Sequence, residues 1–378
     1  MGVKEQRDLV MKQAKRVVVK VGSAVLTGPQ GLDLRVVSRL ADQLAGLHDR
    51  GLDLVLVSSG AVSAGRRVVK ADISDMPARQ AASAIGQSRL MHAYDEAFER
   101  YGKISAQILL TRDDLKSRSR FLNVLNTFRT LLDWRVIPVV NENDTVSVQE
   151  LKFGDNDSLA SLVVNLVGAD LLVNLTSAKG VFDSNPDANP DAKCLTCIEN
   201  ICTMDLGASC DGKTSDGTGG MYSKLLAARR TAQLGVPTLI LSGHEFYGLK
   251  RVFEGEELGT WIVPDGKAIS SRKFWLAYNN QSEGTLVVDP GASAALVNRG
   301  KSLLPAGITA VEGEFEEGSL VRIVDPGGDV LGVGLVNYAA QDLAKIMGRK
   351  SAEIESILGS CPYPEAIHRD NLLLDAAV

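Results

Sequence analysis

Short apolar runs alternate with amphipathic segments along the first two thirds of the chain. Six of these runs, rich in Val, Ile and Leu, are predicted to be buried strands: RVVVKVG, DLVLVSSG, ISAQILLT, RVIPVVNEN, ADLLVNLTS and VPTLILSG. Strands that are apolar along their whole length are typical of a mainly parallel sheet with helices on both faces. Helical periodicity fills the intervals between them, at 34–49, 77–101, 118–133, 155–167 and 221–234. The pattern therefore predicts an α/β domain.

The pattern changes after Pro264. GTLVVD, SLVRIVD and VLGVGLVNY have the length of short strands, turn signals such as DPGG lie between them, and a short helix is predicted near 351–358. This alternation predicts a compact, barrel-like β domain. The boundaries that we expect are 1–264 for the α/β domain, 265–282 for a connector, 283–360 for the β domain and 361–378 for a C-terminal tail.

Composition favours a soluble protein with a small partner. The chain has 378 residues, which is long enough for two or more domains. Of these residues 45% are hydrophobic and 23% are charged, so a large core can be buried. A net charge of −5, without a long block of one sign, gives no electrostatic reason to expect nucleic acid or an anionic membrane as partner. No apolar run approaches the ~18 residues that span a bilayer, and the N-terminal segment is too polar for a signal peptide. We therefore expect a cytoplasmic protein.

The cysteines and histidines give little support to metal or hydrolase chemistry. Four of the five cysteines lie at 194–210 and Cys361 stands alone, which fits free thiols better than a secreted disulfide framework. The CLTC spacing leaves a zinc site open as an alternative, but no second CxxC follows and no histidine lies nearby. The four histidines are scattered, with no HExxH and no hydrolase elbow. We predict no metal ligands.

Polar residues follow the first two predicted strands, at the place where open α/β sheets bind ligands. Lys20 lies near the end of the first strand, in VVKVGS, where a lysine is costly unless it is paired. The second strand continues into SSGAVSAG, where Gly60 permits close backbone approach and Ser59 and Ala61 leave room for a ligand. A rim lysine without function and a plain strand-to-helix turn are the alternative interpretations.

A second polar interval lies between a buried strand and an apolar helix. NENDTV and FGDNDS supply its carboxylate and amide groups: Asn141, Glu142, Asp144, Asp155, Asn156 and Asp157. Asp155 alone could cap the following helix, and a cap needs no more than one such side chain. The remaining groups could bind the ammonium and carboxylate of an amino acid, or orient a lysine.

A Gly-rich loop, DGTGGMYSK at 216–224, opens the last helix of the α/β domain. Its backbone N–H groups and the helix dipole would point at one place, and Lys224 lies one turn into the helix. This pattern favours phosphate binding, with a plain flexible loop as the alternative. GASCDGKT, at 207–214, also matches the Walker A spacing. However, no convincing strand precedes it and SDGTGG cannot start a helix, so we do not predict a P-loop there.

The motifs together resemble a known family. VVKVGS, VLVSSGAVSAG, GQSRL, QILLTRDD, RFLN, PVVNENDTV, KFGDNDSLA and GTGGMYSK are similar, in this order over about 16–264, to the glutamate 5-kinases of the amino acid kinase family. The region 283–358, with DPGASAALVNRGKSLLPAGI, looks like the PUA domain of many bacterial members. The resemblance implies a three-layer αβα sandwich with a mainly parallel central sheet, plus a small β-barrel-like PUA domain. It also implies that Mg²⁺-ATP phosphorylates the γ-carboxylate of L-glutamate to L-glutamyl 5-phosphate in proline biosynthesis.

The resemblance also implies a role for each motif. Lys20 and Lys224 would hold and neutralise the transferred phosphoryl group, and Asp157 would orient both lysines. Glutamate would be bound by Ser59, Gly60, Ala61, Asn141, Asp144 and Asn156. The nucleotide site would be lined by Lys20, Thr176, Ser177, Thr218, Gly219, Gly220, Met221, Tyr222, Ser223 and Lys224. One departure is that this chain reads LTS where the family usually reads LTD, so Ser177 replaces a carboxylate that helps to hold the nucleotide.

Regulation and rival functions complete these expectations. The resemblance implies that proline inhibits the enzyme, through the glutamate site and the loop at 145–153, and we also expect a homo-oligomer. Kinases of the same fold that act on aspartate, acetylglutamate or carbamate are the alternatives nearest to this reading. RNA binding by the PUA-like region is a different alternative. It is disfavoured because 283–358 holds 11 acidic residues against 6 Lys and Arg, a net charge of −5.

Overall fold

The structure is a computed structural model, and it divides into two compact units. Contacts separate Met1–Ala268 from Ile269–Val378. The domain boundaries expected from the sequence stay predictions. The residues that the structure describes are 2–28, 31–69, 75–116, 118–146, 156–186, 188–206, 220–266, 268–278 and 282–374.

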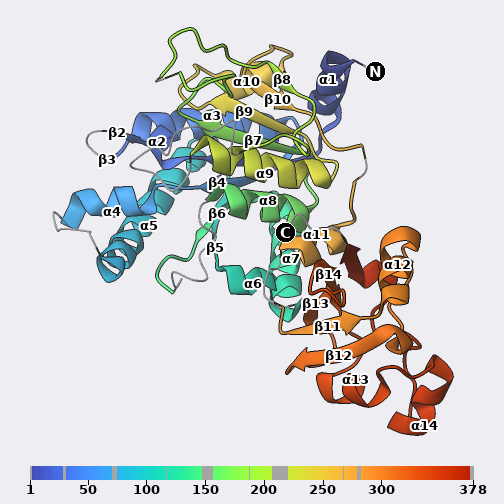
Figure 1. Ribbon diagram of the computed structural model, residues 1–378. Helices are drawn as coiled ribbons and strands as arrows, with labels where there is room; N and C mark the ends of the chain where they lie inside the picture. Colours follow the sequence, from blue (N-terminus) through green and yellow to red (C-terminus); the bar gives the residue numbers. More distant parts are fainter. Residues whose placement is uncertain are drawn as a thin grey trace. The chain divides into compact units, whose positions relative to one another are not determined.

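An eight-stranded sheet forms the centre of the first unit, in the order β5-β6-β4-β1-β7-β9-β10-β8 (Figure 1). The strands are β1 (Arg16–Val21), β4 (Asp53–Ser58), β5 (Ser105–Leu110), β6 (Ile137–Glu142), β7 (Leu171–Thr176), β8 (Cys197–Ile198), β9 (Thr238–Ser242) and β10 (Thr260–Ile262). The six runs identified in the sequence all form strands that pair in parallel. Only β10 and β8, which pair with each other, run against them. The predicted mainly parallel sheet is confirmed.

Helices cover both faces of this sheet and complete a three-layer sandwich. Successive residues of β1 point to opposite faces, so Val17 and Val19 join one apolar cluster and Val18 joins another. The first cluster is closed by α1 (Val3–Gln13), α3 (Leu34–Asp49), α5 (Met76–Glu99) and α10 (Gly248–Phe253). The opposite face is closed by α7 (Arg118–Asp133), α8 (Asn156–Val167) and α9 (Met221–Gln233). The shorter elements of this unit are α2 (Ser23–Leu26), β2 (Thr27–Gly28), β3 (Gly31–Leu32), α4 (Ala61–Val69) and α6 (Arg112–Lys116).

Helices α4 and α5 touch through their backbones. A Cβ atom added at Gly65 would lie 1.8 Å from the carbonyl oxygen of Ala82, and one added at Gly86 would lie 1.7 Å from that of Ala61. Real Cβ atoms do not approach so closely, so glycine is required at both positions. Because α4 starts directly after β4, the contact fixes α5 against the carboxyl end of that strand.

The second unit is built on a five-stranded sheet in the order β12-β11-β13-β14-β15. Its elements are α11 (Ser271–Tyr278), β11 (Gly284–Val288), α12 (Pro290–Arg299), η2 (Pro305–Gly307), β12 (Ile308–Gly313), β13 (Leu320–Val324), β14 (Val330–Leu335), α13 (Ala340–Ile346), η3 (Ser351–Glu353), α14 (Ile354–Leu358), η4 (Arg369–Asn371) and β15 (Leu372–Leu374). Leu276 of α11 packs with Leu320 and Val333, and β15 pairs with β14. Structure therefore continues through parts of both the expected connector and the expected tail.

The described helices differ from a membrane span in length, in hydropathy or in both. In the ranges given above, none combines sufficient length with sufficient apolar character to cross a bilayer.

The α4–α5 contact predicts a large effect of one methyl group. Gly86→Ala must push the two helices apart, and we expect the free energy of unfolding to fall by about 2 kcal/mol or more. Urea unfolding followed by circular dichroism measures this. Gly46→Ala is the matched control, because Gly46 lies inside α3 with no atom within 4 Å of an added Cβ. For Gly46→Ala we expect the free energy of unfolding to rise by about 0.5–1 kcal/mol. Equal losses of stability in the two variants would contradict the prediction.

Candidate active site

The expected site residues lie at the carboxyl ends of four neighbouring strands. Ser58 ends β4, Lys20 is the penultimate residue of β1, Glu142 ends β6 and Thr176 ends β7. Helices α4, α8 and α9 begin at the same edge, at Ala61, Asn156 and Met221. In parallel sheets this edge binds ligands, because helix N-termini present unpaired N–H groups there.

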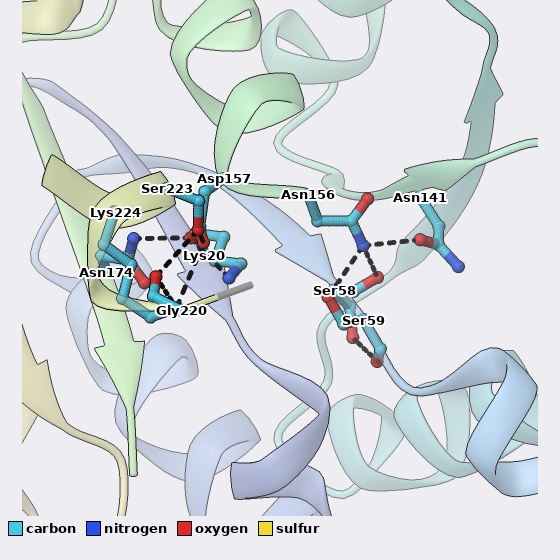
Figure 2. A network of polar contacts seen from close by, with 10 residues as sticks. All are labelled: Lys20, Ser58, Ser59, Asn141, Asn156, Asp157, Asn174, Gly220, Ser223 and Lys224. Atoms are coloured by element: carbon cyan, nitrogen blue, oxygen red, sulfur yellow. Dashed lines mark hydrogen bonds and ion pairs between the residues drawn. The ribbon is translucent and has the colours of Figure 1, made fainter. Parts of the chain in front are cut away.

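A buried carboxylate joins two lysines that are far apart in the sequence. Lys20 Nζ lies 2.5 Å from Asp157 Oδ1, and Lys224 Nζ lies 3.1 Å from Asp157 Oδ2 (Figure 2). Neutral groups add one donor to each oxygen: Asn174 Nδ2 to Oδ1 at 2.8 Å, and Ser223 Oγ to Oδ2 at 2.8 Å. Asp157 is fully buried and the two lysine side chains are only 4% and 7% exposed. We call Lys20, Lys224 and Asp157 the lysine cluster.

The charge state of Asp157 is set by two opposing effects. Burial alone would raise the pKa of this carboxyl, because the charged form loses its hydration. The charges of Lys20 and Lys224, with hydrogen bonds from Lys20 and Asn174, outweigh burial and hold the pKa below its ordinary value. Asp157 is therefore ionised at neutral pH, and the three charged groups of the cluster sum to +1.

Amide and hydroxyl groups form a second cluster beside the first. Asn156 Nδ2 has three acceptors for its two hydrogens: Asn141 Oδ1 at 2.8 Å, Ser59 Oγ at 2.9 Å and the carbonyl oxygen of Ser58 at 3.1 Å. We call Ser59, Asn141 and Asn156 the amide cluster. Figure 2 shows that the Asn156 side chain extends toward the amide cluster, whereas the Asp157 side chain extends toward the lysines. Because Asn156 and Asp157 are consecutive at the start of α8, one peptide unit connects the two clusters.

Gly60 and Ala61 shape the backbone next to Ser59. Gly60 has a φ of +109°, which L side chains rarely adopt, so the turn requires glycine. Ala61 is buried and begins α4. The structure thus brings Ser59, Gly60 and Ala61 together with Asn156 at one corner of the sheet.

Helix α5 supports the amide cluster from behind. Ser83 Oγ donates to Asp144 Oδ2 at 2.8 Å, and Asn141 Nδ2 donates to Gln87 Oε1 at 2.8 Å. Tyr94 lies on the same face of α5, about two helical turns after Gln87, and its hydroxyl is 2.9 Å from Ser58 Oγ. Burial raises the pKa of Tyr94, and the hydrogen bond with Ser58 opposes this only in part. Tyr94 therefore stays neutral and acts as an anchor.

The residues expected to bind the nucleotide are placed less closely together. Thr176 is buried at the end of β7, Ser177 follows it and is exposed, and Tyr222 is half exposed. Gly220 is the N-cap of α9, and its carbonyl oxygen lies 2.9 Å from Ser223 Oγ, where it is the alternative acceptor for the single hydroxyl proton. Met221 instead packs beside the apolar cluster under α9. Thr218 and Gly219 lie outside the described residues, as do Asp155 and the Walker-like segment at 207–214.

Four polar residues of the site were missed by reasoning from the sequence. Asn174 lies within a mainly apolar strand, and the asparagine in the middle of LLVNLT was the signal that could have marked it. The others, Ser83, Gln87 and Tyr94, are four and seven residues apart, so they lie on one face of α5. Gln87 belongs to the GQSRL motif, which carried the resemblance without an assigned role. Ser83 and Tyr94 carry no distinguishing signal.

The cysteine segment does not form a metal centre in the part of the chain that the structure covers. Cys194, Cys197, Cys202 and Cys361 are free thiols, and Cys210 lies outside the described residues. Within the described ranges no group of three or more His, Cys, Asp or Glu could hold a metal ion. Burial raises the pKa of both the Cys197 and Cys202 thiols, which makes them poor ligands at neutral pH.

Known proteins match this chain over nearly its whole length. The model of the amino acid kinase family matches residues 15–242, and that of the PUA domain matches residues 284–358. A glutamate 5-kinase from Maridesulfovibrio salexigens is 65% identical over 374 residues, covering 98% of this chain and 99% of the relative. One from Oleidesulfovibrio alaskensis is 62% identical, covering 99% of each chain. A solved carbamate kinase from Giardia lamblia, bound to AMP-PNP, has 20% identity and a TM-score of 0.49, covering 67% of this chain and 99% of that one. At 65% identity over the full length, the chain belongs to the amino acid kinase family and, within it, to the glutamate 5-kinases.

Proposed function

We propose that the two clusters carry out the reaction after which the relatives are named. The γ-phosphoryl group of ATP is transferred to the side-chain carboxylate of L-glutamate, which gives L-glutamyl 5-phosphate and ADP, the first step of proline biosynthesis. The observation that carries the proposal is that Lys20 and Lys224, from β1 and α9, meet on the two oxygens of Asp157.

The acceptor needs no general base. A side-chain carboxylate has an ordinary pKa of about 4.3, so glutamate is already ionised at neutral pH. A carboxylate oxygen forms the new bond to the γ-phosphorus, the bond from that phosphorus to the β,γ-bridging oxygen breaks, and no proton is transferred. The barrier comes from bringing an anion to an anion, so positive charge and positioning must lower it.

The lysine cluster meets this requirement. Its net charge of +1 is held in a place shielded from water, where charge acts more strongly than it does in solvent. Asp157 keeps the two ammonium groups together, and its four donors leave it no role as a base. Lys20 and Lys224 then contact the phosphoryl oxygens as negative charge builds on them.

Mg²⁺ enters as part of the substrate, Mg²⁺-ATP. Mg²⁺ prefers oxygen ligands and is often held by substrate phosphates and water rather than by a dedicated protein cage. Both oxygens of Asp157 already accept hydrogen from N–H and O–H donors, so this carboxylate does not fit the role of a metal ligand in the arrangement seen.

The amide cluster is the proposed glutamate site. Asn141 and Asn156 offer amide groups, Ser59 offers a hydroxyl, and Asp144 offers a carboxylate for the substrate ammonium. Gly60 and Ala61 add backbone. The nucleotide is proposed to lie against Thr176, Ser177 and the loop before α9, with Ser177 supplying a hydroxyl where the family usually has a carboxylate.

Membership of the family also supports proposals about how the enzyme is regulated, how it assembles and where it is located. Proline is proposed to inhibit the enzyme through the glutamate site and the loop at 145–153, of which 147–153 lies outside the described residues. A homo-oligomer and a cytoplasmic location are also proposed. The free thiols at Cys194, Cys197, Cys202 and Cys361 support a reducing compartment.

The choice of acceptor can be tested directly. The protein is supplied with Mg²⁺-ATP, hydroxylamine and one acid at a time, and the acyl phosphate is trapped as a hydroxamate. We expect product with glutamate and little with aspartate, acetylglutamate or carbamate. Product with aspartate or acetylglutamate in place of glutamate would reassign the enzyme within its fold. For carbamate, whose trapped product is hydroxyurea rather than an amino-acid hydroxamate, ADP release is measured instead.

Removing either lysine should affect turnover more than binding. Lys20→Ala and Lys224→Ala each take one cation from the transferred group, and we expect kcat to fall about 10²- to 10³-fold. The KM for glutamate should change by less than about 3-fold, because the amide cluster is intact. Lys345→Ala is the control, since this lysine pairs with Asp342 on an exposed face of the second unit. Steady-state kinetics with unchanged kcat would refute the role of the lysines.

The Asp157 ion pairs predict a pH-dependent stability. Asp157→Asn leaves two buried ammonium groups without their counter-charge. We expect the free energy of unfolding to fall by about 3–5 kcal/mol at pH 7. The folded pKa of Asp157 lies below its ordinary value of 3.8. The loss should therefore be constant above about pH 4 and shrink as the pH falls through the folded pKa. Urea unfolding of both proteins between pH 7 and pH 3 measures it, and a difference that is already absent at pH 7 would contradict the prediction.

A further inference from the structure

Gln87 ends a chain of hydrogen-bonded amides that begins at Asn156. Asn156 Nδ2 donates to Asn141 Oδ1, and Asn141 Nδ2 donates to Gln87 Oε1, each at 2.8 Å. The glutamine lies on α5, next to Gly86, whose contact with Ala61 holds the two helix backbones together. Its backbone is therefore fixed relative to the turn that carries Ser59.

A backbone group determines which way each amide in this chain faces. The N–H of Glu142 can only donate, and it contacts Asn141 Oδ1 at 2.9 Å. The other end of the Asn141 amide must then be the Nδ2 donor, which requires an acceptor and so faces Gln87 Oε1. This leaves Gln87 Nε2, with two hydrogens, as the free end of the chain.

That free end is buried. The Gln87 side chain belongs to a residue that is only 7% exposed, and its Nε2 atom has no hydrogen-bond partner among the described residues. Buried donors are nearly always paired, because an unpaired one loses its hydration without compensation. A donor left open beside the proposed glutamate site is explained if the substrate supplies the acceptor.

The position of Gln87 indicates which part of the substrate it meets. The reacting carboxylate must lie near the lysine cluster, and Asp157 of that cluster adjoins Asn156. Gln87 is at the opposite end of the amide chain, beyond Asn141. On the same face of α5, Ser83 holds Asp144, the carboxylate proposed for the substrate ammonium. An amino acid that points its side chain at the lysines would place its α-carboxylate at this far end.

We propose that Gln87 is a substrate-binding residue whose Nε2 donates to the α-carboxylate of the bound amino acid. The proposal rests on the proposed function, since it presumes an amino-acid acceptor. It makes Gln87 a specificity residue: acids that lack the α-carboxylate lose this hydrogen bond and leave a buried donor unpaired.

The test uses Gln87→Glu in the full chain. This variant keeps an oxygen for Asn141 Nδ2 but replaces the Nε2 donor with an oxygen, so the KM for glutamate should rise roughly 10- to 100-fold. The lysine cluster is untouched, so kcat should fall less than about 3-fold and the KM for ATP should not change. Gln43→Glu is the matched control, because Gln43 is also a buried helical glutamine and lies on α3, away from the amide cluster. It should leave all three constants unchanged.

A second variant separates substrate binding from a structural role. Gln87→Met removes both the oxygen and the nitrogen of the side-chain amide, and it should weaken glutamate as a substrate. Inhibition by 4-aminobutyrate, which is glutamate without the α-carboxylate, should stay unchanged. Equal weakening of both compounds, or a glutamate KM in Gln87→Glu equal to that of the wild type, would overturn the proposal. Failure of the proposed function itself is seen differently, as no glutamate-dependent hydroxamate from the wild type.

Discussion

The candidate site depends on one buried carboxylate, Asp157. Two ammonium groups brought together in a water-poor place repel each other, and burial further disfavours their charge. Asp157 offsets both effects by giving one oxygen to Lys20 and the other to Lys224, while Asn174 and Ser223 occupy the remaining acceptor directions. The result is a fixed net charge of +1 that exists before any ligand arrives. Charge arranged in advance is effective in catalysis because it does not have to reorganise during the reaction.

The start of α8 connects this charge to the proposed glutamate site. Asn156 and Asp157 are neighbours in the sequence, but their side chains leave in different directions, one to the amide cluster and one to the lysines (Figure 2). In the proposed reaction, the separation between the acceptor and the phosphoryl group is thus set largely by one peptide unit at a helix N-terminus. A buried helix start is among the stiffest supports that a fold offers, and reactions between two bound groups gain most from such fixed geometry.

The sequence predicted strands and most long helices well, because their signals are local. Apolar runs such as RVVVKVG marked β1, and helical periodicity marked α3 and α7 at their observed limits. Lys20 stood out because a charge within an apolar strand needs a reason, and Asp157 stood out as one of six polar residues gathered between a strand and a helix. Asn174 and Gln87 were not found, since their importance comes from what they contact across the fold. A lone asparagine in a strand or a glutamine in a helix looks ordinary until tertiary contacts pair Asn174 with Asp157 and Gln87 with Asn141.

Helix α5 gives these distant contacts their rigidity. Its face toward the site holds Asp144 through Ser83, Asn141 through Gln87 and Ser58 through Tyr94, so one element orients polar groups at the ends of two different strands. Helix α5 can do this only if it cannot slide, and the glycine contact with α4 prevents sliding by leaving no space for side chains between the backbones. Packing that looks purely structural, at Gly65 and Gly86, therefore determines where the amides of the proposed glutamate site point.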